Sequence, residues 1–263
     1  MAPWSPETSS SLPPADVNLP LLHIVAAELR DDAPPEAVQQ ALAYARGLAA
    51  AHGVRAARCG RSDTQLLAAV WLDDAAALEP FAASQEHMSF VMRGLAPAIT
   101  GMWSASVATQ GPPPAQETSG RSDSLWLFAV PQFEGVFEWE VRRLLDDVAT
   151  LPGSVWDGPT IEERERYRAG GAVLLSHAEV RSFQESLAAA RAGWGNLADH
   201  LRGVEQPVAV VLPVRDVVAE CPGYAVAHGV KIGHCPGFQP VGRGVNVLCD
   251  ESCGSHYEVL SAA

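Results

Sequence analysis

The sequence has almost no lysine and no cluster of basic side chains. Its 263 residues include 31 acidic and 18 basic side chains, which give a formal net charge of −13, and Lys231 is the only lysine. Binding to duplex nucleic acid or to an anionic membrane depends on clustered Lys and Arg that neutralise phosphates. We therefore expect no nucleic-acid partner and no membrane partner, and Schiff-base chemistry would depend on Lys231 alone.

Long apolar runs are also missing. No run approaches the roughly 20 residues that a membrane-spanning helix needs. The positive and apolar segments of a secretory signal are absent from the first residues, MAPWSPETSSSLPPADVNLP. We expect a cytoplasmic protein whose residues 1–19 are poorly ordered. The length of 263 residues suits one large or two small globular domains, and the hydrophobic fraction of 48% excludes a fibrous or disordered chain.

A proline-rich segment over residues 110–123, QGPPPAQETSGRSD, is typical of a linker. It separates two blocks, 20–109 and 124–214, in which apolar patterns recur in the same order. In the first block we expect strands over 21–29, 54–59, 65–72 and 101–109, and helices over 33–53 and 73–95. In the second block we expect strands over 125–130, 154–167, 170–176 and 207–214, and helices over 137–151 and 177–201.

The order βαββαβ, found twice, predicts an α+β fold of two tandem ferredoxin-like units. Each unit has one sheet face without helices, and the other unit can cover it. We therefore expect an intramolecular dimeric α/β barrel, as a monomeric pseudo-dimer or as a homodimer. Residues 215–263, rich in glycine and cysteine, belong to neither block and are expected to form a loop-rich tail or lid.

The tail contains side chains that bind metals in other proteins, namely Cys221, Cys235, Cys249 and Cys253 with His228, His234 and His256. No C-x2-C pair is present, so the spacing does not match compact zinc knuckles. Zinc binding, a disulfide and free thiols remain alternatives. The tail also has no G-x-G-x-x-G sequence and no Walker pattern, and we expect no cofactor and no metal in the active site.

Two histidines of the first block are candidates for general acid/base chemistry. His87 lies in the second expected helix, six residues after Phe81 and three before Phe90, near the apolar stripe. His23 shares one face of the first strand with Val25. Imidazole exchanges protons near neutral pH, so two convergent rings could serve as base and acid. The alternatives are a core histidine bonded to backbone and a surface histidine.

Aromatic side chains of the first block could form the walls of a pocket or simply pack in the core. They are Trp71, Phe81, Phe90 and Trp103. Cys59 could imitate the nucleophile of a Cys/His pair, but it has no motif around it.

The strand beginning LHIV and the later F-x5-H-x2-F helix followed by a strand resemble the stress-responsive A/B barrel (Dabb) family of the dimeric α/β barrel superfamily. The resemblance covers the first block. It implies the role known from polyketide-cyclising members, in which a helix histidine is the base and a strand histidine lies nearby, at positions matching His87 and His23. Those members have a tyrosine where Phe81 stands, so a different hydrogen-bond donor, namely Tyr44, Arg93 or a group of the tail, would have to substitute for the tyrosine hydroxyl.

The second block has lost both histidines. Alignment on Phe183 places Ala189 at the position of His87, and the first strand has Trp126. One active half and one structural half are therefore expected. The resemblance implies a cofactor-free polyketide cyclase of the lyase type in bacterial secondary metabolism or antibiotic biosynthesis, acting on an aromatic or polyketide small molecule. The alternatives are a cofactor-independent monooxygenase of phenolic polyketides and a non-catalytic ligand-binding or stress scaffold.

Overall fold

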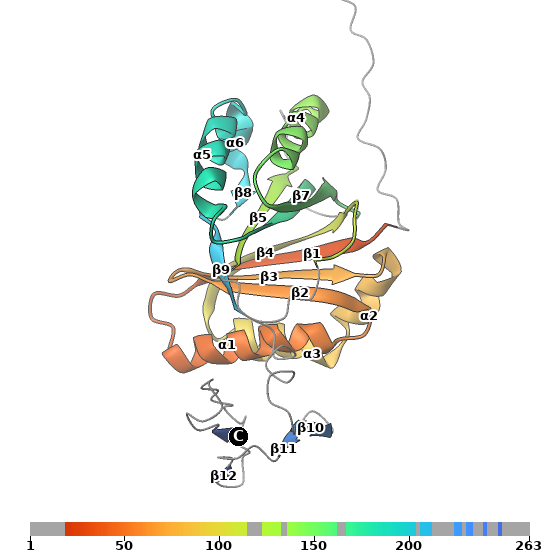
Figure 1. Cartoon of the computed structure of the whole chain (residues 1–263), viewed down its shortest axis with the longest axis vertical. Coiled ribbons are helices and arrows are strands. Elements are labelled where there is room, and N and C mark those ends of the chain that lie inside the picture. Colours follow the sequence, from red (N-terminus) through yellow and green to blue (C-terminus); the bar gives the residue numbers. More distant parts are fainter. Residues whose placement is uncertain are drawn as a thin grey trace, which may run out of the picture. The chain divides into compact units, whose positions relative to one another are not determined.

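The computed structural model describes residues 19–114, 123–132, 136–161, 167–203 and 206–211, together with four short strands of the tail (Figure 1). Contacts divide the chain into two units, Met1–Val211 and Leu212–Ala263. In the second unit β10 (Tyr224–Ala227) pairs with β11 (Val230–Gly233), and β12 (Gln239–Pro240) pairs with β13 (Val247–Leu248). The expected lid and the four tail cysteines lie outside the described residues, as do residues 1–18 and 115–122.

The first unit contains two successive halves. The first half comprises β1 (Leu21–Leu29), α1 (Pro35–Gly47), η1 (Leu48–Ala50), β2 (Val54–Arg61), β3 (Gln65–Leu72), η2 (Ala75–Ala77), α2 (Leu78–Ala82), α3 (Gln85–Ser89), the π-helical turn η3 (Phe90–Leu95) and β4 (Ile99–Ala108). The second half comprises β5 (Ser124–Pro131), α4 (Glu138–Ala149), β6 (Ser154–Pro159), β7 (Tyr167–Leu175), α5 (Val180–Arg191), α6 (Asn196–His200), β8 (Arg202–Gly203) and β9 (Val208–Val211).

Strand order confirms the expected α+β fold of tandem ferredoxin-like units. The strands run β4-β1-β3-β2 in the first half and β9-β5-β7-β6 in the second, and all the pairs are antiparallel. Helices α1 to α3 lie on one side of the strands and α4 to α6 on the other (Figure 1).

Two seams join the halves. At one seam β2 pairs with β9, where Cys59 lies opposite Val211. At the other seam β4 meets the end of β6, through a bridge between Val107 and Thr160. The edges of the two sheets therefore meet at both seams, and a common apolar core contains residues of both halves.

Alternation along β1 separates two cores. Leu22 and Ile24 belong to the core between the halves, where Trp71 of β3 contacts Trp156 of β6 with ring centroids 5.1 Å apart. Leu21 and Val25 face the other way, toward α1 and the segment from α2 to η3. His23 lies between Leu21 and Val25 in sequence, so its side chain is on this helix-facing side.

The two long second helices expected from apolar spacing are each broken. In the first half the helix over 73–95 is divided at Ala83 and Ser84, because Ser84 is extended (φ −66°, ψ 153°) and its hydroxyl caps a new helix. In the second half the helix over 177–201 ends at Arg191, and Gly195 adopts φ +55° before α6 begins. The spacing of apolar residues continues across both interruptions, so the sequence pattern alone does not reveal the two helix breaks.

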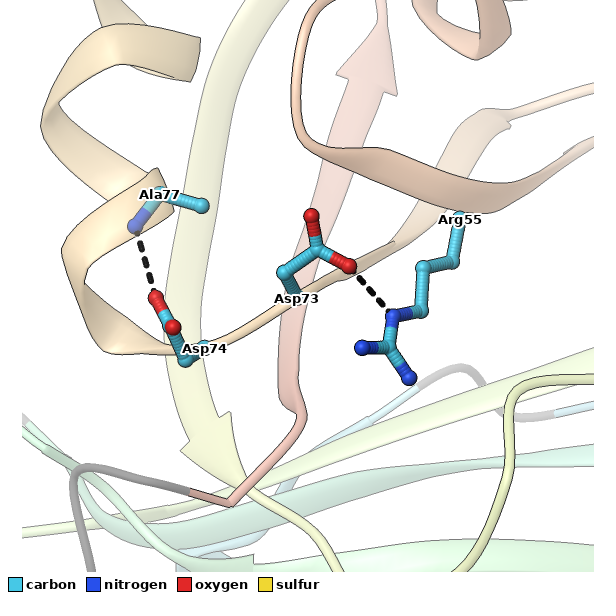
Figure 2. Close-up of polar contacts among 4 residues, drawn as sticks. All are labelled: Arg55, Asp73, Asp74 and Ala77. Carbon is cyan, nitrogen blue, oxygen red and sulfur yellow. Dashed lines mark hydrogen bonds and ion pairs between the residues drawn. The ribbon is translucent and has the colours of Figure 1, made fainter.

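The connection from β3 to α2 is fixed by two aspartates (Figure 2). The carboxylate of Asp73 pairs with the Arg55 guanidinium of β2, and the carboxylate of Asp74 accepts the N–H of Ala77. Asp74 is thus the N-cap of η2. These contacts set where α2 begins and therefore where Phe81 meets the sheet.

Candidate functional site

The structure brings His23 of β1 and His87 of α3 together on the helix-facing side of the first half. Their ring centroids are 6.1 Å apart, and both side chains are partly buried. Phe81 of α2 contacts both rings, with centroid distances of 5.9 Å to His23 and 4.9 Å to His87. The three rings come from separate elements and form the centre of the candidate site.

The helix break at Ser84 positions His87. The Ser84 hydroxyl accepts the backbone N–H of His87 at 3.2 Å and so holds His87 in the first turn of α3. A helix continuing straight from α2 would rotate residue 87 to another face. The break is therefore part of how the site is built.

A carbonyl fixes the proton of His87. Its Nδ1 lies 2.9 Å from the carbonyl oxygen of Ala82. A carbonyl oxygen only accepts hydrogen bonds, so Nδ1 must be the donor. In the neutral ring the lone pair is then on Nε2, which is able to accept a proton.

His23 is held neutral. Burial, and then the charge of His87, lower the pKa of His23 from 6.5 to about 4. Its Nδ1 lies 3.1 Å from the hydroxyl oxygen of Ser106 on β4. At neutral pH the site thus contains an uncharged imidazole beside a second imidazole whose Nε2 can act as a base.

The lowered pKa of His23 predicts acid-dependent stability. Because the folded pKa is below the unfolded value, the unfolded state binds the proton more tightly between pH 6.5 and 4. The contribution of His23 to the free energy of unfolding is complete above pH 6.5 and is lost as the pH falls toward 4. The slope of this loss is up to about 1.4 kcal/mol per pH unit. Urea unfolding of the wild type and His23→Gln between pH 7 and 4 should show this slope as a difference between them. Parallel curves for the two proteins would contradict the assignment.

The other expected pocket residues are placed differently. Phe90 is fully buried in the helix-facing core, and Tyr44 packs against η3 at Gly94, where an added Cβ would lie 3.3 Å from the tyrosine ring. Arg93 is exposed. Neither a hydrogen bond nor a ring contact joins Tyr44 or Arg93 to either imidazole in the described part of the structure.

Trp71 and Trp103 are on the opposite face of the sheet from His23. Trp71 pairs across β1 with Leu22, and Trp103 pairs with Ala26, both residues of the core between the halves. Trp103 contacts Tyr167 of the second half at 6.0 Å. Both tryptophans thus pack at the core between the halves, which was one of the two alternatives, because Trp71 and Trp103 lie one and three residues from the strand positions opposite His23.

Cys59 is not available as a nucleophile. Its thiol donates to the carbonyl of Ala45 at 3.3 Å, and burial raises its pKa to about 12. Among the residues that the structure describes, no three His, Cys, Asp or Glu side chains group closely enough to bind a metal ion. None of the described helices is long and apolar enough to span a membrane.

In the second half an indole stands where the first half has His23. Trp126 of β5 contacts Phe183 of α5 at 5.4 Å and 63°, and His23 contacts Phe81 at 5.9 Å and 63°. Trp126 also stacks on Phe128, and all three rings are buried. The second half thus repeats the ring arrangement with apolar side chains alone.

Sequence reasoning missed Ser106, which lies opposite His23 in the β1–β4 register and is only 3% exposed. Its signal was the alternation of β4, where Ser104 and Ser106 share one face. That signal could be used only if the register between the two strands were known.

Comparisons with known proteins support the fold alone. No family model matches the sequence, and no curated protein matches it. An anthrone oxidase-like protein aligns with a TM-score of 0.50 at 11% identity, over 73% of this chain and 91% of that chain. A protein of Fusobacterium nucleatum named as a candidate monooxygenase aligns with a TM-score of 0.49 at 15% identity, over 74% of this chain and 93% of that chain.

A ferredoxin-like Dabb family protein of Mesorhizobium loti aligns with a TM-score of 0.31 at 19% identity, over 35% of this chain and 99% of that chain. Fold and site together define a class, a tandem ferredoxin-like α+β protein with paired imidazoles in its first half.

Proposed function

We propose that the protein is a cofactor-free acid/base enzyme that removes a proton from carbon next to a carbonyl group. The supporting observation is the convergence of His23 and His87 at 6.1 Å with different hydrogen-bonding partners. Nε2 of His87 takes the proton, and His23 donates a hydrogen bond to the oxygen on which negative charge develops. Neighbouring rings can contact the carbon and oxygen ends of one enolisable group together.

Cyclisation of a polyketide-like substrate is the reaction that we propose first. The enolate carbon forms a bond to a second carbonyl carbon of the same molecule. The electron pair of that carbonyl moves to its oxygen, which takes back the proton held by His87. Base, substrate and product are then balanced without an oxidant, and the chemistry suits a lyase or cyclase of bacterial secondary metabolism.

A cofactor-independent monooxygenase is the second candidate, because it begins with the same deprotonation. The carbanion of a phenolic ketone such as anthrone would react with O2, so that its methylene becomes a carbonyl and the other oxygen atom leaves as water. Two structural neighbours bear names of this kind, an anthrone oxidase-like protein and a candidate monooxygenase. A binding scaffold without turnover is the third possibility.

Proton exchange tests the shared step. The full chain is incubated without oxygen in D2O with anthrone and, separately, with a β-ketoacyl thioester, and loss of the acidic methylene proton is followed by NMR. We expect exchange faster than with His87→Gln for at least one compound. Exchange equal to that of the variant for both compounds would contradict the proposal. Repetition under ¹⁸O2 then separates the two reactions, since only the monooxygenase places label in the product.

A further inference from the structure

Ser106 is the polar side chain that contacts His23 from the neighbouring strand. It lies directly opposite His23 in the β1–β4 register, and its hydroxyl is 3.1 Å from Nδ1. The residue is 3% exposed, so bulk water does not compete freely for this contact. The other ring nitrogen, Nε2, is farther from the backbone and therefore on the side of the helices.

The second half of the chain holds Ser106 in place. The carbonyl of Ser106 accepts the N–H of Ile161 at 3.1 Å, and the next residue, Val107, bridges to Thr160. The serine is thus fixed by β1 on one side and by the end of β6 on the other. Although the second half has lost the histidines, its backbone contributes to the geometry of the remaining site.

The two imidazoles need opposite hydrogen-bonding roles. His87 donates through Nδ1 to Ala82 and presents a lone pair on Nε2. If His23 also presented a lone pair on Nε2, the two imidazoles would offer two acceptors and no donor to an anionic oxygen. Phe81 has no hydroxyl, and no hydrogen bond joins Tyr44 or Arg93 to the rings, so within the described part of the site His23 is the remaining candidate for the donor.

We propose that the Ser106 hydroxyl donates its hydrogen bond to Nδ1 of neutral His23 and thereby keeps the proton of His23 on Nε2. His23 is then the hydrogen-bond donor of the site, and Ser106 is a positioning residue that selects its tautomer. The choice of this tautomer, like its catalytic meaning, rests on the proposed function, whereas the 3.1 Å contact between Ser106 and Nδ1 does not.

The tautomer can be measured directly in the full-length chain. Two-bond ¹H–¹⁵N correlation spectra of protein with ¹⁵N-labelled histidine distinguish a protonated ring nitrogen from one with a lone pair. Signals of His23 are assigned by their loss in His23→Gln. At pH 7 we expect His23 to be protonated on Nε2 and His87 on Nδ1. Protonation of His23 on Nδ1 in the wild type would overturn the inference without any variant.

Ser106→Ala removes the hydroxyl with almost no change in volume. We expect a mixture of His23 tautomers in this variant, an unchanged His87 signal, and restoration of the single tautomer by Ser106→Thr. Retention of pure Nε2 protonation in Ser106→Ala would show that another group selects the tautomer and would also overturn the inference. The exchange rate of the methylene proton should fall about fivefold to tenfold in Ser106→Ala, the effect of one lost hydrogen bond.

A pair of His23 variants separates this inference from the proposed function. The amide nitrogen of glutamine reaches near the position of Nε2, whereas that of asparagine lies near Nδ1. If His23 is the donor, His23→Gln should retain more exchange activity than His23→Asn. An Nε2 proton without any exchange activity would refute the proposed function alone, and an Nδ1 proton with activity would refute only the role of Ser106.

Discussion

Replacement of Gly158 by alanine is expected to lower the free energy of unfolding by about 3 kcal/mol or more. Gly158 is in β6, at the seam where the second half meets β4. A Cβ at this position would lie 2.1 Å from the backbone oxygen of Ala108. Neither atom can rotate away as a flexible side chain would, so the seam has to open.

Gly101→Ala is the matched control, because Gly101 lies in β4 and an added Cβ would meet only the Glu28 side chain at 3.8 Å. Urea unfolding at pH 7 should give a control change within about 1 kcal/mol. Similar stabilities for Gly158→Ala and Gly101→Ala would mean that β4 and β6 are not in close contact. A barrel closed by the two halves would then be wrong.

His87→Gln is expected to slow methylene proton exchange by about 10² to 10⁴, the usual contribution of a general base. Glutamine keeps a polar side chain at this partly buried position but has no basic nitrogen. The fold should be retained, because the backbone N–H of His87 would still be bonded to the Ser84 hydroxyl. Rates are measured by NMR in D2O with the compound that the wild type turns over.

His52→Gln is the control for this measurement. His52 is exposed and lies in the turn before β2, outside the candidate site. Its replacement should leave the exchange rate unchanged. Equal rates for His87→Gln and His52→Gln would show that the base is another group.

Strands of the first half could be predicted closely because they are apolar runs bounded by polar or turn residues. The bounds of β1 and β3 agree with the sequence prediction at both ends. The second helix of the first half could not be predicted closely. The extended backbone of Ser84 interrupts this helix without disturbing the apolar spacing of Phe81, Phe90 and Leu95. A capping serine inside a periodic segment has the same sequence signal as a helix surface residue.

Convergence of the two histidines was within reach of sequence reasoning, since alternation places His23 on one face and helical spacing places His87 near the core. Whether Trp71 and Trp103 share the face of His23 could not be predicted, for a simple reason. Which residue of β3 or β4 lies opposite His23 depends on strand register, and a shift of one residue reverses the face. Because the register between β1 and β4 was unknown, the contact between Ser106 and His23 could not be predicted either.

A double-mutant cycle on His23 and His87 tests the account most directly. Exchange rates are measured for the wild type, His23→Asn, His87→Gln and the double variant, with the compound that the wild type turns over. Groups that act together on one substrate give strongly non-additive losses. We predict a double variant about as slow as His87→Gln alone. Losses that multiply independently, or a double variant as active as the wild type, would contradict a single site built on this pair.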